Sequence, residues 1–124
     1  MKKTIIIIAI FVAVLGSLNP LSAWYANRGF SENNIHKCMT AASLKKAMLN
    51  FNGASKVYSK IIQTFPHSSS MDDARYFYAF CLERDHETHA AISAYRQYLG
   101  FHPSGQHANS AQIKLKNLIA LQHS

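Results

Sequence analysis

Apolar side chains recur every three or four residues along most of the chain beyond residue 34. The clearest case lies between residues 54 and 65, where apolar positions fall at i, i+3, i+4, i+7, i+8 and i+11. These positions are Ala54, Val57, Tyr58, Ile61, Ile62 and Phe65. This spacing places all six on one face of an α-helix that begins near Asn50 or Asn52. Pro66 follows at once and predicts the end of the helix.

A first helix is predicted before this one, at about residues 35–48, with Asn33 or Asn34 as its cap. A third helix is predicted after it, because Ser70 with Asp73 resembles a capping box. It carries two apolar stripes. One consists of Ala74, Phe77, Tyr78, Cys81 and Leu82, and the other of Tyr76 and Phe80.

Asp85 and His86 are expected to separate this helix from a fourth one and to cap it. The fourth helix has an apolar stripe at Ala91, Ile92, Tyr95, Tyr98 and Leu99. Gly100 is predicted to cap its end in the left-handed conformation. The last helix is expected at about 108–122, with Ala111, Leu115, Leu118 and Ile119 inward. No segment alternates cleanly as a strand would, so the pattern predicts an all-α protein of five helices.

The segment 1–23 has the layout of a secretory signal peptide. Lys2 and Lys3 precede an apolar run from Ile5 to Leu18, and Pro20 to Ala23 supply a break and a small residue. The apolar run is shorter than the roughly 20 residues that a membrane-spanning helix needs. Cleavage after Ala23 and export to the periplasm of a bacterium are therefore expected. The alternative is an uncleaved anchor that tethers the domain.

Residues 24–34 show no sustained period and are interpreted as an N-terminal arm. Its aromatic side chains, Trp24, Tyr25 and Phe30, either fold back on the first helix or stay mobile. Residues 35–122 then form the domain. No cysteine follows the apolar run closely, so no lipid attachment site is predicted.

The segment from Ala54 to Pro66 returns later in the chain. Ala54, Tyr58 and Pro66 correspond to Ala91, Tyr95 and Pro103, each 37 residues further on, and Ala74 corresponds to Ala111 in the same way. A fixed period of about 20–50 residues is typical of stacked repeats.

These residues resemble the tetratricopeptide repeat pattern. Ala74–Ala79 with Ala91, Tyr95 and Pro103 matches a whole unit, and Ala42 stands in the earlier unit where Ala79 stands in the later one. The resemblance implies an α-α superhelix of about two helical hairpins plus a C-terminal capping helix. It extends to two periplasmic groups, the Tol–Pal-associated repeat proteins and the repeat domain of the lipoprotein of outer-membrane β-barrel assembly. The period of 37 rather than about 34, the missing lipobox and the missing coiled coil depart from them.

Members of this family bind partners in a concave groove lined by the first helix of each unit. The resemblance implies a groove with the positions Met39, Lys46, Tyr76, Phe80, Arg84, Ile113 and Asn117. Ser43, Asp73 and Glu83 share this register. Aromatic residues anchor peptide interfaces, and Arg84 could hold a carboxylate. The alternative is that Tyr76 and Phe80 pack against the neighbouring first helices.

The formal net charge is +7, or +5 without Lys2 and Lys3. The basic residues are scattered, which is typical of a solvated surface, and an exported chain without a basic stripe is not expected to bind nucleic acid. A positive surface could instead dock on anionic lipid or cell-wall glycan. Two units lie below the minimum of about three for a stable stack, so the last helix or a homodimer is expected to complete the core.

No metal, cofactor or catalytic group is predicted. His86 and His89 lie near Glu83, Asp85 and Glu87, but the histidine spacing differs from the i, i+4 spacing of zinc proteases. A solvated helix junction is the preferred interpretation. The chain contains no Gly-x-Ser-x-Gly elbow, no phosphate-binding glycine loop and no Cys-x-x-Cys.

Cys38 and Cys81 are expected to remain separate, mostly buried thiols. In the repeat register they are staggered by six residues, which is about 9 Å along neighbouring helices. Their axes would lie about 8–10 Å apart, whereas a disulfide needs Cα atoms within about 7 Å. The sequence thus favours a non-catalytic adaptor that binds a protein or peptide, with an envelope-docking structural protein as the alternative.

Overall fold

The computed structural model describes residues 2–123, apart from the side chains of Leu15, Ser17 and Leu18. This part of the chain contains six α-helices and no strand. The helices are α1 (Lys2–Ser31), α2 (Ile35–Ala47), α3 (Phe51–Thr64), α4 (Met71–Arg84), α5 (Thr88–Phe101) and α6 (Ala108–Gln122). The prediction of an all-α fold is confirmed.

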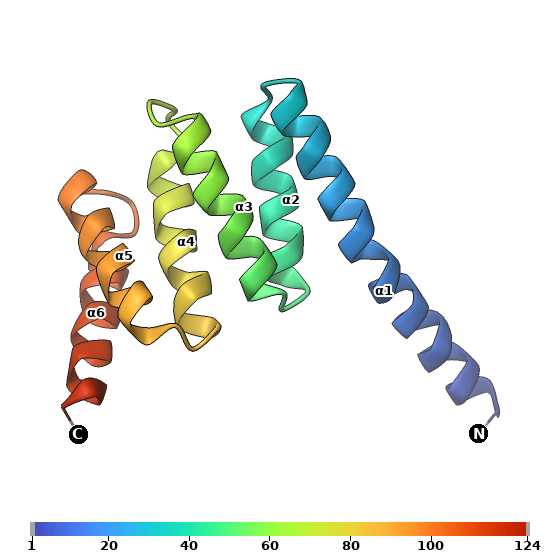
Figure 1. The fold of residues 1–124 in the computed structure, drawn as a ribbon. Coiled ribbons are helices and arrows are strands. Elements are labelled where there is room, and N and C mark those ends of the chain that lie inside the picture. Colours follow the sequence, from blue (N-terminus) through green and yellow to red (C-terminus); the bar gives the residue numbers. More distant parts are fainter. Residues whose placement is uncertain (1, 124) are drawn as a thin grey trace.

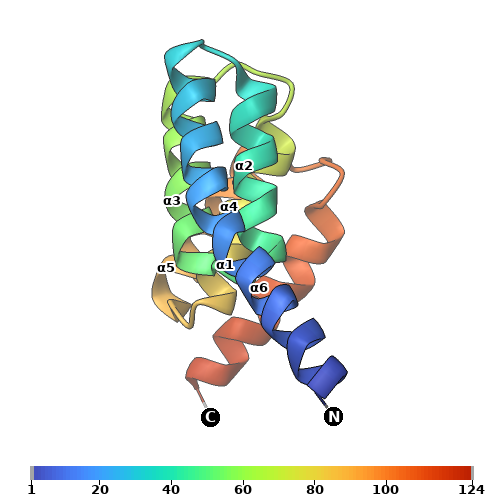
Figure 2. The same ribbon diagram turned by 90° about the vertical axis from the view of Figure 1, so that its right-hand side faces the viewer.

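Each helix packs on its neighbours in the sequence, so the six form one row from α1 to α6 (Figure 1). Viewed along the row, α3 and α5 lie on one side and α2 and α6 on the other (Figure 2). This two-layered row of antiparallel neighbours is an α-α superhelical arrangement, as the repeat resemblance implied.

Polar side chains set two of the predicted helix starts. The Asn34 side chain accepts a hydrogen bond of 3.2 Å from the backbone N–H of Lys37, and the Asn50 side chain accepts one of 3.0 Å from Gly53. Both bonds satisfy a backbone N–H that the first helical turn leaves without a partner. At the other end of α3, Phe65 is the C-cap residue directly before Pro66.

Two predicted caps are wrong, and a third is right only in its position. Ser70 is the N-cap residue of α4 but makes no side-chain bond to the helix. It has helical backbone angles, and the chain turns tightly there through the Met71 N–H to the Ser68 carbonyl, 3.1 Å. Asp85 and His86 do separate α4 from α5, with His86 at φ 62°, but the N-cap of α5 is Glu87. Gly100 lies inside α5, and the C-cap is His102.

The position of Gly100 leads to a prediction. No atom lies within 4 Å of a Cβ built at this residue, and its φ is not positive. Gly100→Ala is therefore expected to stabilise the protein by about 0.5–1 kcal/mol, because alanine loses less backbone entropy in a helix. Urea unfolding in detergent micelles measures this change. A destabilised variant would mean that Gly100 does cap the helix in the left-handed conformation.

The core has two clusters that share α4. One lies among α2, α3 and α4 and includes Tyr58, and the other lies among α4, α5 and α6 and includes Tyr95. Both tyrosines are fully buried. Burial raises the pKa of Tyr58 to about 12, and burial together with the hydrogen bond to Glu83 raises the pKa of Tyr95. The recurring stretch identified in the sequence is thus a packing element.

Cys38 and Cys81 both lie fully buried in the first cluster, and neither forms a disulfide. The prediction of two separate thiols is confirmed. Burial raises the pKa of the Cys81 thiol to about 11. Such a thiol is almost entirely protonated at neutral pH and behaves as a small apolar side chain.

Most of the predicted N-terminal arm, residues 24–34, is helical and packs back on the first predicted helix, which was one of its two alternatives. The arm belongs to α1, and this helix continues without a break to Ser31. Its second half packs on α2 through small side chains at i, i+4 and i+7, namely Ser22, Ala26 and Gly29, all of which are buried. Phe30 packs against the first core cluster. The pattern of large apolar side chains did not predict this contact, because small residues make it.

Candidate partner-binding surface

Side chains of the alternate helices α2, α4 and α6 meet on one side of the row. The Lys46 ammonium of α2 lies 3.3 Å from the centre of the Phe77 ring of α4. Between α4 and α6, the Lys114 ammonium lies 3.6 Å from a Glu83 carboxylate oxygen. We call this side the α2–α4–α6 face. The groove that the resemblance implies would lie on this face.

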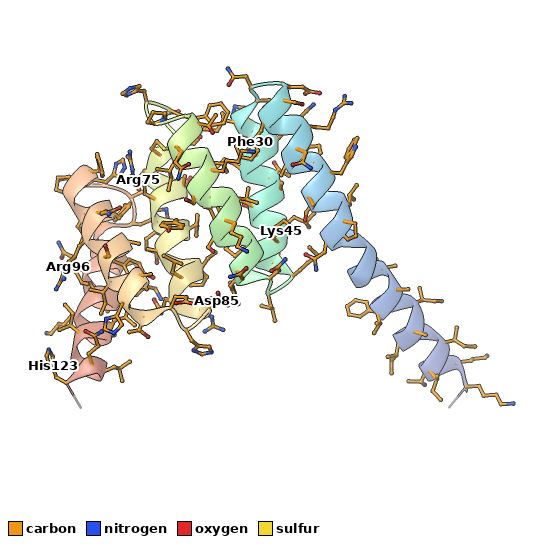
Figure 3. The ribbon with its side chains drawn as sticks, in the orientation of Figure 1. Phe30, Lys45, Arg75, Asp85, Arg96 and His123 are labelled. Carbon is orange, nitrogen blue, oxygen red and sulfur yellow. The ribbon has the colours of Figure 1, made fainter. Side chains whose placement is uncertain are left out.

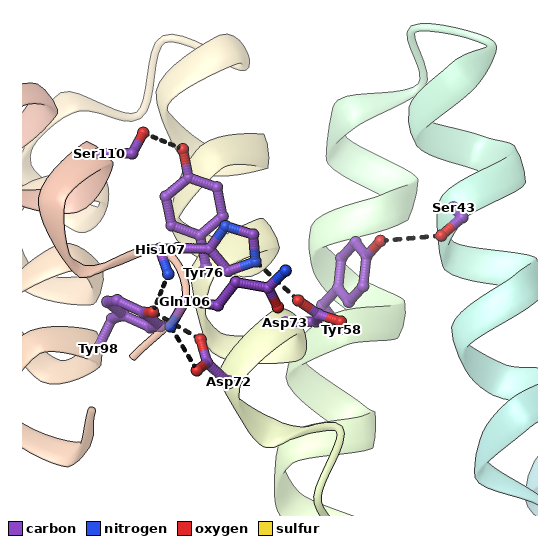
Figure 4. A network of polar contacts seen from close by, with 9 residues as sticks. All are labelled: Ser43, Tyr58, Asp72, Asp73, Tyr76, Tyr98, Gln106, His107 and Ser110. Carbon is purple, nitrogen blue, oxygen red and sulfur yellow. Dashed lines mark hydrogen bonds and ion pairs between the residues drawn. The ribbon is translucent and has the colours of Figure 1, made fainter. Parts of the chain in front are cut away.

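Tyr76 belongs to the core of this layer. It is only 6% exposed. Its ring stacks on that of His107 at 4.3 Å, and its hydroxyl lies 2.7 Å from Ser110 Oγ (Figure 4). Of the two interpretations of Tyr76, the structure supports packing between first helices, and this residue is not available to a partner.

Two predicted residues of α2 are half-buried. Met39 packs against the first core cluster. The Lys46 side chain lies over Phe77, and its burial lowers its pKa. Both contribute more to the joint between α2 and the rest of the row than to an open surface.

We give the name Phe80 cluster to a group of five side chains on this face. Its members are Phe80, Arg84, Phe51, Glu83 and Lys114. Phe80 is half-buried, and its ring meets Phe51 edge-on at 6.2 Å. The Lys114 ammonium lies 5.2 Å from the centre of the Phe80 ring. The exposed Arg84 guanidinium lies 5.5 Å from the centre of the Phe51 ring. Two aromatic rings thus lie next to two cations.

Glu83 links the Phe80 cluster to the buried core and holds the Lys114 side chain. One carboxylate oxygen accepts a hydrogen bond of 2.7 Å from the Tyr95 hydroxyl, and the other lies 3.6 Å from the Lys114 ammonium. Because Tyr95 is fully buried, Glu83 is held from the core side and in turn holds Lys114. Phe80 therefore has a cation beside it whose direction is set by the fold.

The predicted residues of α6 are open to solvent. Ile113 is 54% exposed, and Asn117 is also exposed. Each lies next in sequence to a basic residue, Lys114 or Lys116. They add an exposed apolar side chain and an amide to the last helix of the row.

A polar network holds α6 and its preceding loop against α4 (Figure 4). The buried Tyr98 hydroxyl donates to Asp72 at 2.6 Å and accepts from the His107 N–H at 2.9 Å. The Gln106 N–H also donates to Asp72, at 2.9 Å. Burial tends to raise the pKa of Asp72, but the bonds from Tyr98 and Gln106 bring it below the usual value.

This network predicts a loss of stability in acid. Because the folded-state pKa of Asp72 lies below the unfolded value, its contribution is complete above about pH 4. It is lost as the pH falls through the folded-state pKa. Unfolding free energies across this range should fall more steeply for the native protein than for Asp72→Asn. Equal slopes would show that Asp72 does not contribute.

Two members of the Phe80 cluster, Phe51 and Lys114, were not among the predicted site residues. Phe51 begins α3 and Lys114 lies on α6, so the two are far apart in the sequence. No local spacing brings such residues together. The only sequence signal is the repeat itself, because Lys114 stands one repeat period after Phe77, the residue that Lys46 covers.

A separate cleft of about 410 Å³ lies between α3 and α5, with α4 between them. The Arg75 guanidinium reaches into it and lies 3.9 Å from the centre of the exposed Phe101 ring and 3.0 Å from His102 Nε2. Burial lowers the pKa of Arg75. The cleft lies on the other side of the row from the predicted groove.

The residues around His86 do not converge. Glu83 turns to Tyr95, and His89 Nδ1 lies 2.9 Å from the Gln122 amide nitrogen. Within residues 2–123 no group of three or more His, Cys, Asp or Glu side chains is arranged to hold a metal ion. These side chains serve the junctions of α4, α5 and α6.

No protein-family model matches the chain, and neither the curated proteins nor the solved structures gave a significant match.

Proposed function

We propose that the protein is an exported, non-catalytic adaptor of tetratricopeptide type. It binds a peptide or protein segment on the α2–α4–α6 face, in the periplasm, where it serves envelope organisation or outer-membrane assembly. The observation that carries the proposal is the Phe80 cluster, in which the half-buried Phe80 ring lies next to Lys114 and the neighbouring Phe51 ring lies next to the exposed Arg84.

The repeat supports the tetratricopeptide assignment. Residues that correspond across the repeat period have the same surroundings, since Ala54 and Ala91, Tyr58 and Tyr95, and Ala74 and Ala111 are all fully buried. Small residues at such positions let neighbouring helices approach closely, and the tyrosines fill the space between them. Two hairpins, α2–α3 and α4–α5, followed by α6 correspond to two units and a capping helix.

The chemistry of the cluster defines the partner. Phe80 and Phe51 offer apolar ring surface, on which a side chain of the partner packs. Arg84 and Lys114 offer positive charge on either side, and the exposed Arg84 can bind a carboxylate with two hydrogen bonds. The expected ligand is a segment with an apolar anchor and a nearby acidic group or chain end.

Charge reversal tests this proposal. Arg84→Glu is expected to weaken partner binding at least about tenfold, because a charged hydrogen bond is worth about 1.5–3 kcal/mol. Arg96→Glu is the matched control, because Arg96 is an exposed arginine on α5 (Figure 3). Binding is read as partner recovered with the tagged full-length protein from crosslinked envelopes. Equal loss with both variants would indicate a general charge effect and reject the proposed face.

A second candidate is an envelope-docking structural protein. A cleft of about 220 Å³ between the packed half of α1, α2 and α3 is lined by Lys45, Lys56 and Lys60. Three lysines around one cleft suit a phosphate or a carboxylate of an anionic lipid or a cell-wall glycan. Release of the protein from anionic vesicles or sacculi at moderate salt, with no protein partner recovered, would favour this candidate.

The proposal includes self-association as one way to cover α6. This helix ends the row, and its Ile113 is 54% exposed. A homodimer through α6 would cover that side, and sedimentation of the full chain in micelles measures it.

A further inference from the structure

The helix α1 consists of two halves with different surroundings. The first half is exposed at every described large apolar residue, which are Ile5, Ile6, Ile7, Ile8, Ile10, Phe11, Val12 and Val14. The second half packs on α2, as described above. Figure 3 shows the first half projecting from the row with its apolar side chains around it. One helix thus leads directly from an apolar rod into the folded domain.

The uncharged part of α1 is long enough to cross a membrane. No charged residue occurs between Lys3 and Arg28. At about 1.5 Å per residue this stretch is about 36 Å of helix, against about 30 Å of hydrocarbon. Within it an 18-residue window has a mean hydropathy of 2.3.

The flanks of this stretch suit the two faces of a bilayer. Lys2 and Lys3 stand at one end, as on the cytoplasmic side of an anchor. Trp24, which is 55% exposed, stands near the other end with the Arg28 guanidinium 5.6 Å from the centre of its ring. Exposed tryptophan next to a basic side chain is typical of the membrane–water interface.

The turn between α2 and α3 lies beside this apolar rod. Ala47, Met48 and Leu49 line a hollow of about 450 Å³ together with Val12, Gly16 and Asn19 of α1. The Asn50 side chain donates a hydrogen bond of 3.1 Å to the Asn19 side chain and fixes the turn there. Figure 1 shows this turn at the end of the row from which α1 projects.

Leu49 is unusual for a leucine both in its exposure to solvent and in its backbone conformation. It is 71% exposed, the most exposed large apolar residue of the described chain, and it has a left-handed backbone with φ 62°. This conformation is strained for a residue with a Cβ, and Gly or Asn usually takes it. In water no buried contact of the leucine offsets this strain, whereas insertion into lipid would bury its side chain.

We propose that α1 is retained as a membrane anchor and that the Met48–Leu49 turn enters the same leaflet beside it. The partner of this surface is the lipid bilayer. The two contacts fix the orientation of the row, because the helix and the turn are joined by the Asn19–Asn50 bond. The α2–α4–α6 face then stands at a fixed angle to the membrane, and binding there is independent of this proposal.

Cleavage after Ala23 would be incompatible with this arrangement. It would separate Asn19 from Asn50 and remove the buried Ser22 from its place against α2. The peptide bond between Ala23 and Trp24 lies within the continuous helix α1. The proposal therefore requires that the protein in the membrane keep its first residues.

A fluorophore attached at position 49 tests the lipid contact. Full-length Leu49→Cys, labelled with an environment-sensitive dye, is reconstituted into vesicles of phosphatidylethanolamine and phosphatidylglycerol. Ser93→Cys is the control, because Ser93 is exposed on α5, and the fully buried Cys38 and Cys81 are protected from the dye. The expected result is blue-shifted emission at 49, quenched by spin-labelled lipid, and water-like emission at 93. Water-like emission at both positions would overturn the second contact.

The intact mass of the protein from membranes tests retention of the anchor. The proposal predicts the full chain of 13.9 kDa in the membrane fraction after alkaline washing. A chain that begins at Trp24 would overturn it. Leu49→Asn suits the left-handed backbone and is expected to fold normally. It is expected to weaken the contact between the turn and the vesicle bilayer, so that loss of this contact is distinguished from loss of the fold. Either result leaves the partner-binding test at Arg84 unchanged.

Discussion

Replacing Tyr76 with alanine is expected to lower the free energy of unfolding by about 3–5 kcal/mol, the range for loss of a large buried aromatic ring. The reason is its central position: the ring stacks on His107 at 4.3 Å and lies 5.7 Å from the ring of Tyr98. Since a small domain has only about 5–15 kcal/mol in total, α6 should separate from the row first. Amide hydrogen exchange of α6 measures this effect.

Tyr76→Phe is the matched control. It keeps the ring and loses only the hydroxyl contact with Ser110, at 2.7 Å, so it should cost about 1 kcal/mol. Protection of α6 should remain close to that of the native protein. If alanine and phenylalanine had the same small effect, Tyr76 would not be the residue that joins α4 to α6.

Gly29→Leu is expected to separate the second half of α1 from α2. A Cβ at this position would lie 2.9 Å from the Cys38 backbone nitrogen, and equally close to the Cys38 Sγ and the Lys37 Cβ. Backbone atoms of a helix cannot yield to such a contact. Overpacking in a core costs about 1–3 kcal/mol, and a leucine adds more atoms than one Cβ.

Gly16→Leu serves as its control, because no atom lies within 4 Å of a Cβ at that position. Hydrogen exchange of residues 20–31 should rise in the Gly29 variant and stay unchanged in the Gly16 variant. Unchanged exchange in both would show that α1 does not pack on α2 and would remove the basis for the anchored arrangement.

The sequence predicted the helical row because its strongest signals are local. The apolar face from Ala54 to Phe65 and its recurrence 37 residues later are periodic patterns, and a period of 3–4 residues specifies a helix without reference to the rest of the chain. The bounds 108–122 of the last helix were predicted to the residue. Tyr58 and Tyr95 were correctly identified as packing residues.

Two features were not predicted from the sequence: the packing of α1, which depends on a tertiary contact, and the end of α5, which depends on a backbone hydrogen bond. The second half of α1 is held by Ser22, Ala26 and Gly29, and small residues give no apolar period. Gly100 resembles a cap by its position before Pro103, yet α5 continues to Phe101 because the His102 N–H still bonds to the Tyr98 carbonyl at 2.8 Å.

The candidate site was predicted in part. Phe80 of the second apolar stripe is half-buried and Arg84 is exposed on α4, but Tyr76 of the same stripe lies inside. The difference follows from α6, which covers the start of α4 through His107 and Ser110 and leaves its later turns more open. Lys114 could be assigned to the site only after the row was assembled.

Photocrosslinking at Phe80 tests the adaptor proposal most directly. A photoreactive amino acid replaces Phe80 in the full chain in native membranes, and a second variant carries it at the exposed Ser93 of α5. We expect one defined protein adduct from position 80, absent from position 93 and reduced by Arg84→Glu. Adducts of equal yield from both positions, or an adduct from position 93 alone, would contradict binding on the α2–α4–α6 face.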